Sequence, residues 1–175
     1  MTLRQFLFIA ALLTAASVAG SGVRPQPPVE PAEPATDAVI DLAGLPGVEF
    51  GDTEQELTER GMLRTSAESC GPTLTGHDTA SPIFYDDRLV LLWVSPPVRT
   101  PEGITVGTPV SEVSSRFPAL TRLTAPQGTY RFDGLLARRG DRAYLFLHDG
   151  RTVRKTIAGY ADYAERLFDE GYGPC

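Results

Sequence analysis

The chain of 175 residues carries 16 basic and 22 acidic side chains, which gives a formal net charge of −6. Nucleic acids and anionic membranes are bound by clustered cations, so this scattered acidic excess argues against both as partners. The length is sufficient for one domain that buries its own hydrophobic core.

The first twenty residues predict a secretory signal peptide over 1–20. Arg4 precedes an uncharged apolar stretch over 6–19, and small residues at 17–20 form a typical cleavage site. We therefore expect a secreted or extracytoplasmic protein, associated with the cell surface or free, with no membrane insertion after cleavage. An uncleaved N-terminal anchor is the alternative, although the apolar stretch is short for a membrane span.

Residues 21–37 predict a disordered, proline-rich linker. Prolines recur throughout 24–36, and each fixes its own backbone angle and has no N–H to donate. A stalk, or a ligand for a proline-binding groove, is the alternative interpretation. The folded domain is expected over 38–175.

Two separate stretches have nearly the same sequence, "LPGVEFGDTEQELTERG" at 45–61 and "PEGITVGTPVSEVSSRF" at 101–117. Further along, "FYDDRLV" at 84–90 resembles "FLHDGRTV" at 146–153, with Gly150 as one extra residue. The same order of both matches predicts two tandem repeats, over about 45–98 and 101–160, followed by a C-terminal segment.

Each repeat predicts one short helix. In the first, Asp52 or Thr53 can cap the helix, with a capping-box partner three residues later, and Gly61 ends it. In the second, Thr108 is the expected cap and Pro109 the first helical residue. An apolar stripe then follows on one face of that helix, at Val110, Val113 and Phe117.

Strands are expected on both sides of Asp86-Asp87 within 82–95, and then near 129–132, 134–138, 142–148 and 152–158. Helices of about eight residues are unstable alone in water, so each must pack on this antiparallel sheet. The predicted fold class is α+β, built from two similar halves that each place a short helix on an antiparallel sheet.

The end of the chain predicts a helix around 161–170 that ends at Gly171. Ala161, Ala164, Leu167 and Phe168 share one stripe of this helix, which is expected to cover a face of the sheet. The chain has two cysteines, Cys70 and Cys175, and in an exported protein we expect them to form a disulfide. A two-cysteine metal site is a weaker interpretation, because only His77 and His148 could add imidazole ligands.

Each copy resembles the small α+β module of the BamE (SmpA/OmlA) lipoproteins. The resemblance is carried by the helix starts in Gly51–Gly61 and Gly107–Phe117 and by the later Asp87-Arg88 and Asp149-Gly150-Arg151. In tandem, the module resembles that of the β-lactamase inhibitory proteins. The resemblance implies a fold of two modules. The lipid-modified cysteine of BamE lipoproteins is absent, and only one short helix is evident in each copy.

No catalytic motif is recognisable, and no metal or cofactor is expected. His77-Asp78 and His148-Asp149 put an imidazole beside a carboxylate, but neighbouring strand residues point to opposite faces, so both histidines are expected to be solvated turn residues. The tripeptide "RGD" at 139–141 matches an integrin-binding motif and is interpreted as a hairpin tip.

Five aromatic residues fall on predicted strands and form either core or a partner-binding face: Trp93, Tyr130, Phe132, Tyr144 and Phe146. We expect a non-enzymatic binding or interaction domain, inhibitor-like or otherwise protein-binding, with an unidentified partner. A small secreted enzyme and a structural component of the cell envelope are the alternatives. An exposed aromatic patch favours binding, and a deep pocket that holds a histidine with a carboxylate favours the enzyme.

Overall fold

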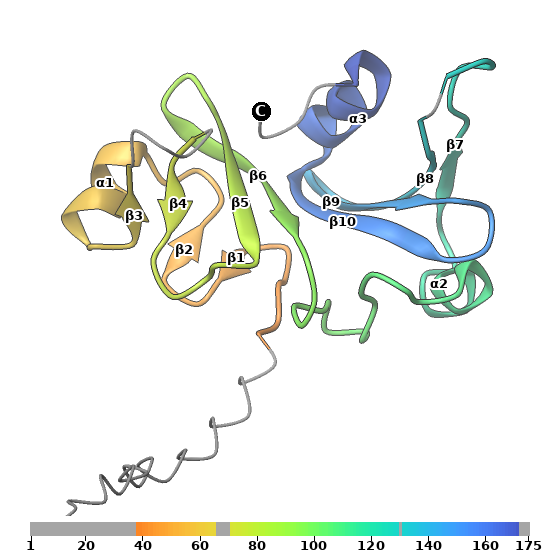
Figure 1. Cartoon of the computed structure of the whole chain (residues 1–175), viewed down its shortest axis with the longest axis horizontal. Coiled ribbons are helices and arrows are strands. Elements are labelled where there is room, and N and C mark those ends of the chain that lie inside the picture. The colour runs from red at the N-terminus through yellow and green to blue at the C-terminus, as the bar shows by residue number, and fades with distance from the viewer. Residues whose placement is uncertain (1–37, 66–70, 130, 172–175) are drawn as a thin grey trace, which may run out of the picture. The chain divides into compact units, whose positions relative to one another are not determined.

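An antiparallel sheet of six strands is the central element of the computed structural model (Figure 1). Its strands are β5 (Ala80–Tyr85), β6 (Arg88–Val94), β7 (Thr121–Leu123), β8 (Asp133–Arg139), β9 (Arg142–His148) and β10 (Val153–Tyr160). They lie in the order β5-β6-β10-β9-β8-β7. The structure describes residues 38–65, 71–129 and 131–171, which all belong to one structural unit, 33–175.

Shorter elements complete the α+β fold. β1 (Gly44–Leu45) pairs with β2 (Val48–Glu49), and β3 (Leu63–Arg64) pairs with β4 (Thr73–Leu74). The helices of the described residues are α1 (Glu54–Glu59), α2 (Val110–Arg116) and α3 (Ala161–Glu170). The expected positions of these helices are therefore confirmed.

The start of α1 is the predicted capping box. The Thr53 hydroxyl accepts a hydrogen bond from the Glu56 amide at 3.1 Å, and the Glu56 carboxylate accepts one from the Thr53 amide at 2.8 Å. The Glu56 carboxylate accepts hydrogen bonds from both the amide and the hydroxyl of Thr53, and these hold the pKa of Glu56 below its usual value. Gly61, with φ of 71°, follows the helix end.

The start of α2 differs from the expectation by one residue. Pro109 is the N-cap, not Thr108, and its extended ψ of 140° keeps it outside the helix. The Thr108 hydroxyl instead accepts from the Thr105 amide at 3.1 Å. The Thr108 carbonyl accepts from the Val153 amide at 2.9 Å, so this residue is held in an extended pairing with β10 and cannot turn into the helix.

The strand expected at 129–132 is not formed in the residues described there. Gly128 has φ of 77°, and the Thr129 amide donates to the Pro126 carbonyl at 3.2 Å, so a turn occupies this place. β7 pairs with β8 instead, in a position for which no strand was expected. Phe132 therefore precedes β8, and Tyr130 lies outside the described residues.

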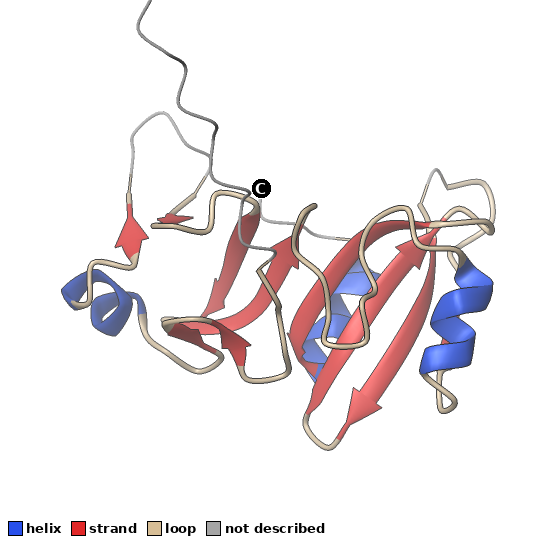
Figure 2. Ribbon diagram, turned by 90° about the horizontal axis from the view of Figure 1, so that it is seen from below, coloured by secondary structure: helices blue, strands red, loops and turns tan. Residues whose placement is uncertain are grey.

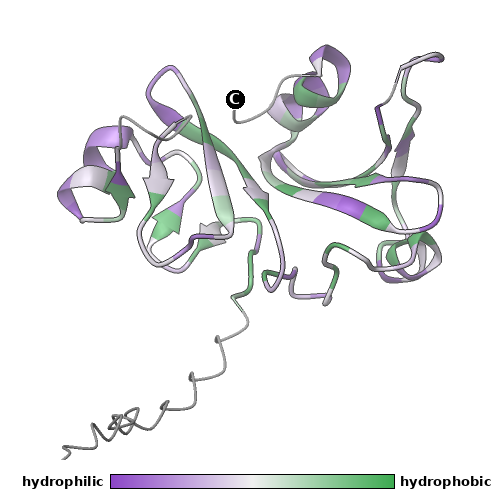
Figure 3. Ribbon diagram, in the orientation of Figure 1, coloured by the Kyte–Doolittle hydropathy of each residue, from purple (hydrophilic) through white to green (hydrophobic). Residues whose placement is uncertain are grey.

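The sheet is covered on both faces by different helices, as Figure 2 shows for α2 and α3. One face packs with α1 and α2 in a cluster that includes Leu57, Val113, Phe117, Leu89, Leu92, Tyr144, Phe146 and Val153. The other packs with α3, whose predicted stripe is buried, in a cluster that includes Leu91, Leu136, Leu145 and Ile157. Figure 3 shows the hydrophilic tip of the β5–β6 hairpin against more apolar central strands.

Two hairpins of the sheet have the same register. In β5–β6 the partners change from Ile83–Leu91 to Phe84–Leu89, with Val90 as the extra residue of a bulge. In β9–β10 the corresponding pairs are Leu147–Lys155 and His148–Val153, with Arg154 as the extra residue.

The segments before α1 and α2 are joined to these hairpins by the same two hydrogen bonds. The Gly51 amide donates to the Leu89 carbonyl at 2.9 Å, and the Leu89 amide donates to the Asp52 carbonyl at 2.8 Å. The corresponding residues before α2 are Gly107, Val153 and Thr108, at 2.8 and 2.9 Å.

These hydrogen bonds differ from the sequence alignment by one position. With Gly150 as an extra residue, the alignment places Val90 against Val153, whereas the hydrogen bonds make Leu89 the counterpart of Val153. Leu89 and Val153 are both fully buried in the cluster beside α1 and α2, but the bulge residue Val90 packs on the α3 side.

Candidate functional site

A cleft with a volume of about 190 Å³ lies on the α3 side of the sheet. Its walls come from β6, β9 and β10, from the segment before β8 and from the end of α3. The lining residues are Trp93, Arg131, Phe132, Leu147, Lys155, Leu167, Phe168 and Gly171. Two of the five predicted partner-binding residues, Trp93 and Phe132, therefore meet in one place, and both are half-buried.

Strand pairing positions the centre of this cleft. Trp93 lies opposite Ile157 where β6 pairs with β10, and Lys155 is two residues from Ile157 on the same face. The Lys155 ammonium group lies 4.3 Å from the centroid of the Trp93 ring, a cation–π contact. They are the only tryptophan and the only lysine of the chain.

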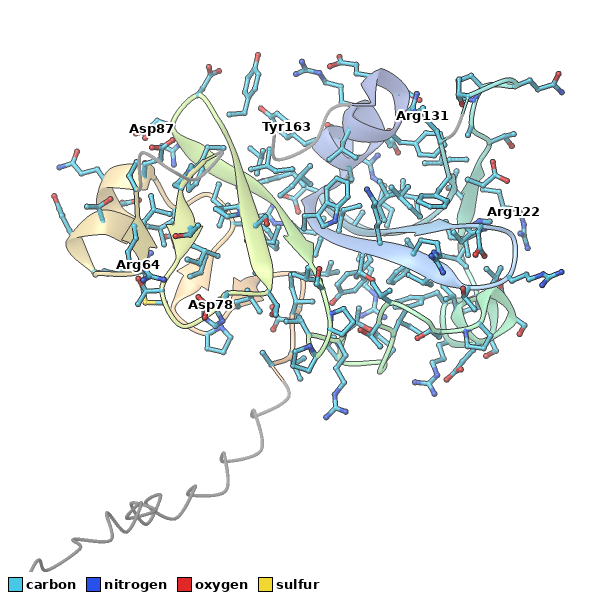
Figure 4. The ribbon with its side chains drawn as sticks, viewed as in Figure 1. Arg64, Asp78, Asp87, Arg122, Arg131 and Tyr163 are labelled. Carbon is cyan, nitrogen blue, oxygen red and sulfur yellow. The ribbon has the colours of Figure 1, made fainter. Side chains whose placement is uncertain are left out.

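Arg131 lines the cleft, and Figure 4 shows this residue beside α3. Its guanidinium group lies 5.5 Å from the Phe168 ring centroid and donates to the Asp169 carbonyl at 3.2 Å. The last carbonyls of a helix lack intrahelical partners and carry partial negative charge. Arg131 therefore caps the C-terminus of α3, close to Gly171, whose φ of 73° ends the helix.

The cleft is cationic in a protein of net negative charge. Among the described residues, its lining includes Lys155 and Arg131 but no carboxylate, and none of them forms an ion pair with Lys155. The cleft beside Phe117 is different, because both of its arginines are paired. There Arg138 contacts Asp162 and Glu165, and Arg139 contacts Glu102.

Two other predicted partner-binding residues, Tyr144 and Phe146, are core residues. Their exposed fractions are 2% and 0%, and the Phe117 ring of the α2 segment lies 5.8 and 5.5 Å from theirs. Side chains alternate along β9, so these two point away from the cleft, towards α2. Of the two expected roles, core or binding surface, these two residues therefore have the first.

The sequence interpretation missed Lys155, Arg131 and Phe168 as members of the cleft. Alternation along β10 places Lys155 on the same face as Ile157, but the sequence carries no signal that β6 is the neighbouring strand. Arg131 and Phe168 meet only because α3 folds back over the sheet.

Neither histidine lines the cleft, and His148 corrects an expectation. It ends β9 with an exposed fraction of 8%, so it is not a solvated turn residue. Its Nδ1 accepts a hydrogen bond from the Gly150 amide at 3.1 Å, and burial lowers its pKa. His77 Nε2 lies 3.0 Å from the Pro46 carbonyl oxygen.

Several other expectations concern metal, membrane or surface motifs. The described residues contain no group of three or more metal-ligating side chains and no helix that is long and apolar enough to cross a bilayer. The "RGD" tripeptide is at the β8–β9 turn, where Gly140 has φ of 64°. The signal segment 1–20, the linker 21–37 and the pair Cys70 and Cys175 lie outside the described residues.

Comparisons with family models, with curated proteins and with solved structures found no significant match.

Proposed function

We propose that the protein is an exported, non-enzymatic binding domain that engages a partner protein through the cleft beside α3. The observation that carries this proposal is the pairing of half-buried Trp93 with Lys155, a cation that has no ion-pair partner among the described residues. Tryptophan in a partly enclosed site is the residue type that contributes most to protein–protein affinity.

The size of the cleft favours a protein partner over a dedicated small-molecule substrate. Small-molecule pockets have volumes of about 300–1,000 Å³ and bury most of their ligand. The present cleft, at about 190 Å³, holds little more than one or two side chains. The described residues of its walls include no nucleophile–base pair, so binding is a simpler role for it than catalysis.

The proposal includes two equivalent halves, as in the tandem modules that the sequence resembles. The matching bulges and the matching hydrogen bonds of Gly51 and Gly107 support it. The pairing of β6 with β10 supports it too. Trp93 and Ile157 each lie three residues after the bulge residue of their own hairpin, and they are directly opposite each other. A local two-fold axis at this pair would relate the halves and place the cleft next to their junction.

The partner can be sought by comparing closely matched baits. The wild-type domain, a Trp93→Ala variant and a Val39→Ala control are immobilised and exposed to the extracytoplasmic fraction of the source cells. Val39 is 40% exposed and does not line the cleft. We expect a protein that wild type and Val39→Ala retain and Trp93→Ala loses, as quantified by mass spectrometry.

The alternative functions predict other results. A structural envelope component acting through another surface would be retained equally by all three baits. An enzyme would release a chemically altered product from that fraction, whereas a binding domain leaves its partner unaltered. The first result would exclude the cleft as the binding site. The second would exclude a non-enzymatic function.

A further inference from the structure

We infer that the cleft recognises a carboxylate side chain that a partner polypeptide presents next to an apolar side chain. This inference rests on the proposed function and names the chemistry of the partner. It follows from three features of the cleft: the charge of Lys155, the contacts of Arg131 with α3, and the apolar side chains that form the walls.

The charge of Lys155 is the first step. Its ammonium group has three donors, lies over the Trp93 ring and forms no ion pair with a described residue. The contact with the aromatic ring orients the group but leaves it donors for a ligand. An anion is therefore the complementary ligand at this position.

Arg131 supplies the second step, because much of its bonding capacity is already used. It donates to the Asp169 carbonyl at the end of α3 and stacks against Phe168. Its charge is thereby partly compensated by the helix terminus. Lys155 is left as the main partner of the ligand's charge. Its ammonium group is a compact point charge that can pair with one carboxylate without the bidentate geometry of a guanidinium group.

The walls determine what must accompany the carboxylate. Apart from the two cations and Gly171, the lining consists of apolar residues: Trp93, Phe132, Leu147, Leu167 and Phe168. Burying an apolar side chain there contributes affinity that an isolated carboxylate lacks. An aspartate or glutamate beside an aromatic or aliphatic residue provides both groups within one short segment of a polypeptide.

Because Trp93 is the only tryptophan, its fluorescence reports binding in the full mature chain. The probes are two capped dipeptides, phenylalanine–glutamate and its neutral counterpart phenylalanine–glutamine. We expect saturable changes in Trp93 emission, with about tenfold weaker binding of the neutral peptide, equivalent to about 1.4 kcal/mol. Added salt should weaken only the charged peptide's binding.

Two substitutions assign the effect to Lys155. Lys155→Gln should remove the preference for glutamate, and Lys155→Arg should restore most of it. Arg154→Gln is the matched control, since it removes the neighbouring charge from a residue that is exposed and outside the cleft. Far-ultraviolet circular dichroism checks that each variant is folded.

Three results would overturn the inference. The first is equal affinity for the two peptides, and the second is an unchanged preference in Lys155→Gln. The third concerns a variant that ends at Gly171 and carries Cys70→Ser, because Cys175 is removed with the end of the chain. If the peptides bound this variant and not the full chain, the cleft would be assigned to the chain's own last four residues.

The partner-retention experiment separates this inference from the proposed function. If Trp93→Ala loses the partner but Lys155→Gln retains it, the cleft binds a protein without recognising a carboxylate. If both variants retain it, the proposed function fails as well.

Discussion

Trp93 and Ile157 lie directly opposite each other in the six-stranded sheet, where β6 pairs with β10. The same pairing joins the two hairpins whose bulges correspond, and it holds Trp93 next to Lys155. One strand pairing thus connects the proposed halves and also builds the cleft.

Glycines at corresponding positions before α1 and α2 should both resist substitution, to different extents. Gly51 and Gly107 have φ of 101° and 94°, a conformation that is strained for other residues. Gly107→Ala should lower the free energy of unfolding by about 1–3 kcal/mol. Gly51→Ala should cost more, because its Cβ would lie 2.9 Å from the Tyr160 hydroxyl oxygen. Urea denaturation measures both, and a neutral Gly107→Ala would contradict the expectation.

Substitutions of aromatic residues should distinguish the core face from the cleft. Phe146 is fully buried beside the α2 segment, so Phe146→Ala should lower the free energy of unfolding by about 3–5 kcal/mol. Trp93 is only half-buried, and Trp93→Ala should cost clearly less while abolishing partner retention. Denaturant titration of both variants tests this, and similar losses would contradict the assignment of Trp93 to a binding surface.

The stability of the domain should fall in mild acid because of His148. Burial lowers its folded-state pKa below the usual value of 6.5, so the unfolded chain binds the proton more readily. The stabilisation is present above pH 6.5 and is lost as the pH falls towards the folded-state pKa. Unfolding free energies at pH 8 and pH 5 should therefore differ more for wild type than for His148→Gln. Equal differences would refute a pKa shift at this residue.

Cys70 and Cys175 should be joined by a disulfide if the chain reaches an oxidising compartment. A disulfide restricts the unfolded chain, so Cys70→Ser should lower the free energy of unfolding by about 2–5 kcal/mol without changing peptide binding. Mass spectrometry of the non-reduced protein should detect one peptide that links the two cysteines. Two alkylatable thiols in freshly secreted protein would exclude the bond.

Local features of the fold could be predicted from the sequence because their causes are close together in the chain. The capping box joins residues three apart, Gly171 ends α3 by its own backbone angle, and the β5–β6 turn falls at Asp86-Asp87, between the two strands expected there. The failures have different causes: Thr108 is held by a hydrogen bond with a strand that is distant in the chain, and Thr129 belongs to a turn.

Which aromatic residues form the candidate site was decided only by tertiary structure. Alternation along β9 places Tyr144 and Phe146 on one face, but it is the packing of α2 that buries that face. The cleft requires β6 beside β10 and α3 folded back over the same face. These contacts join residues far apart in the chain, and a pattern confined to neighbouring residues cannot encode which of them will meet.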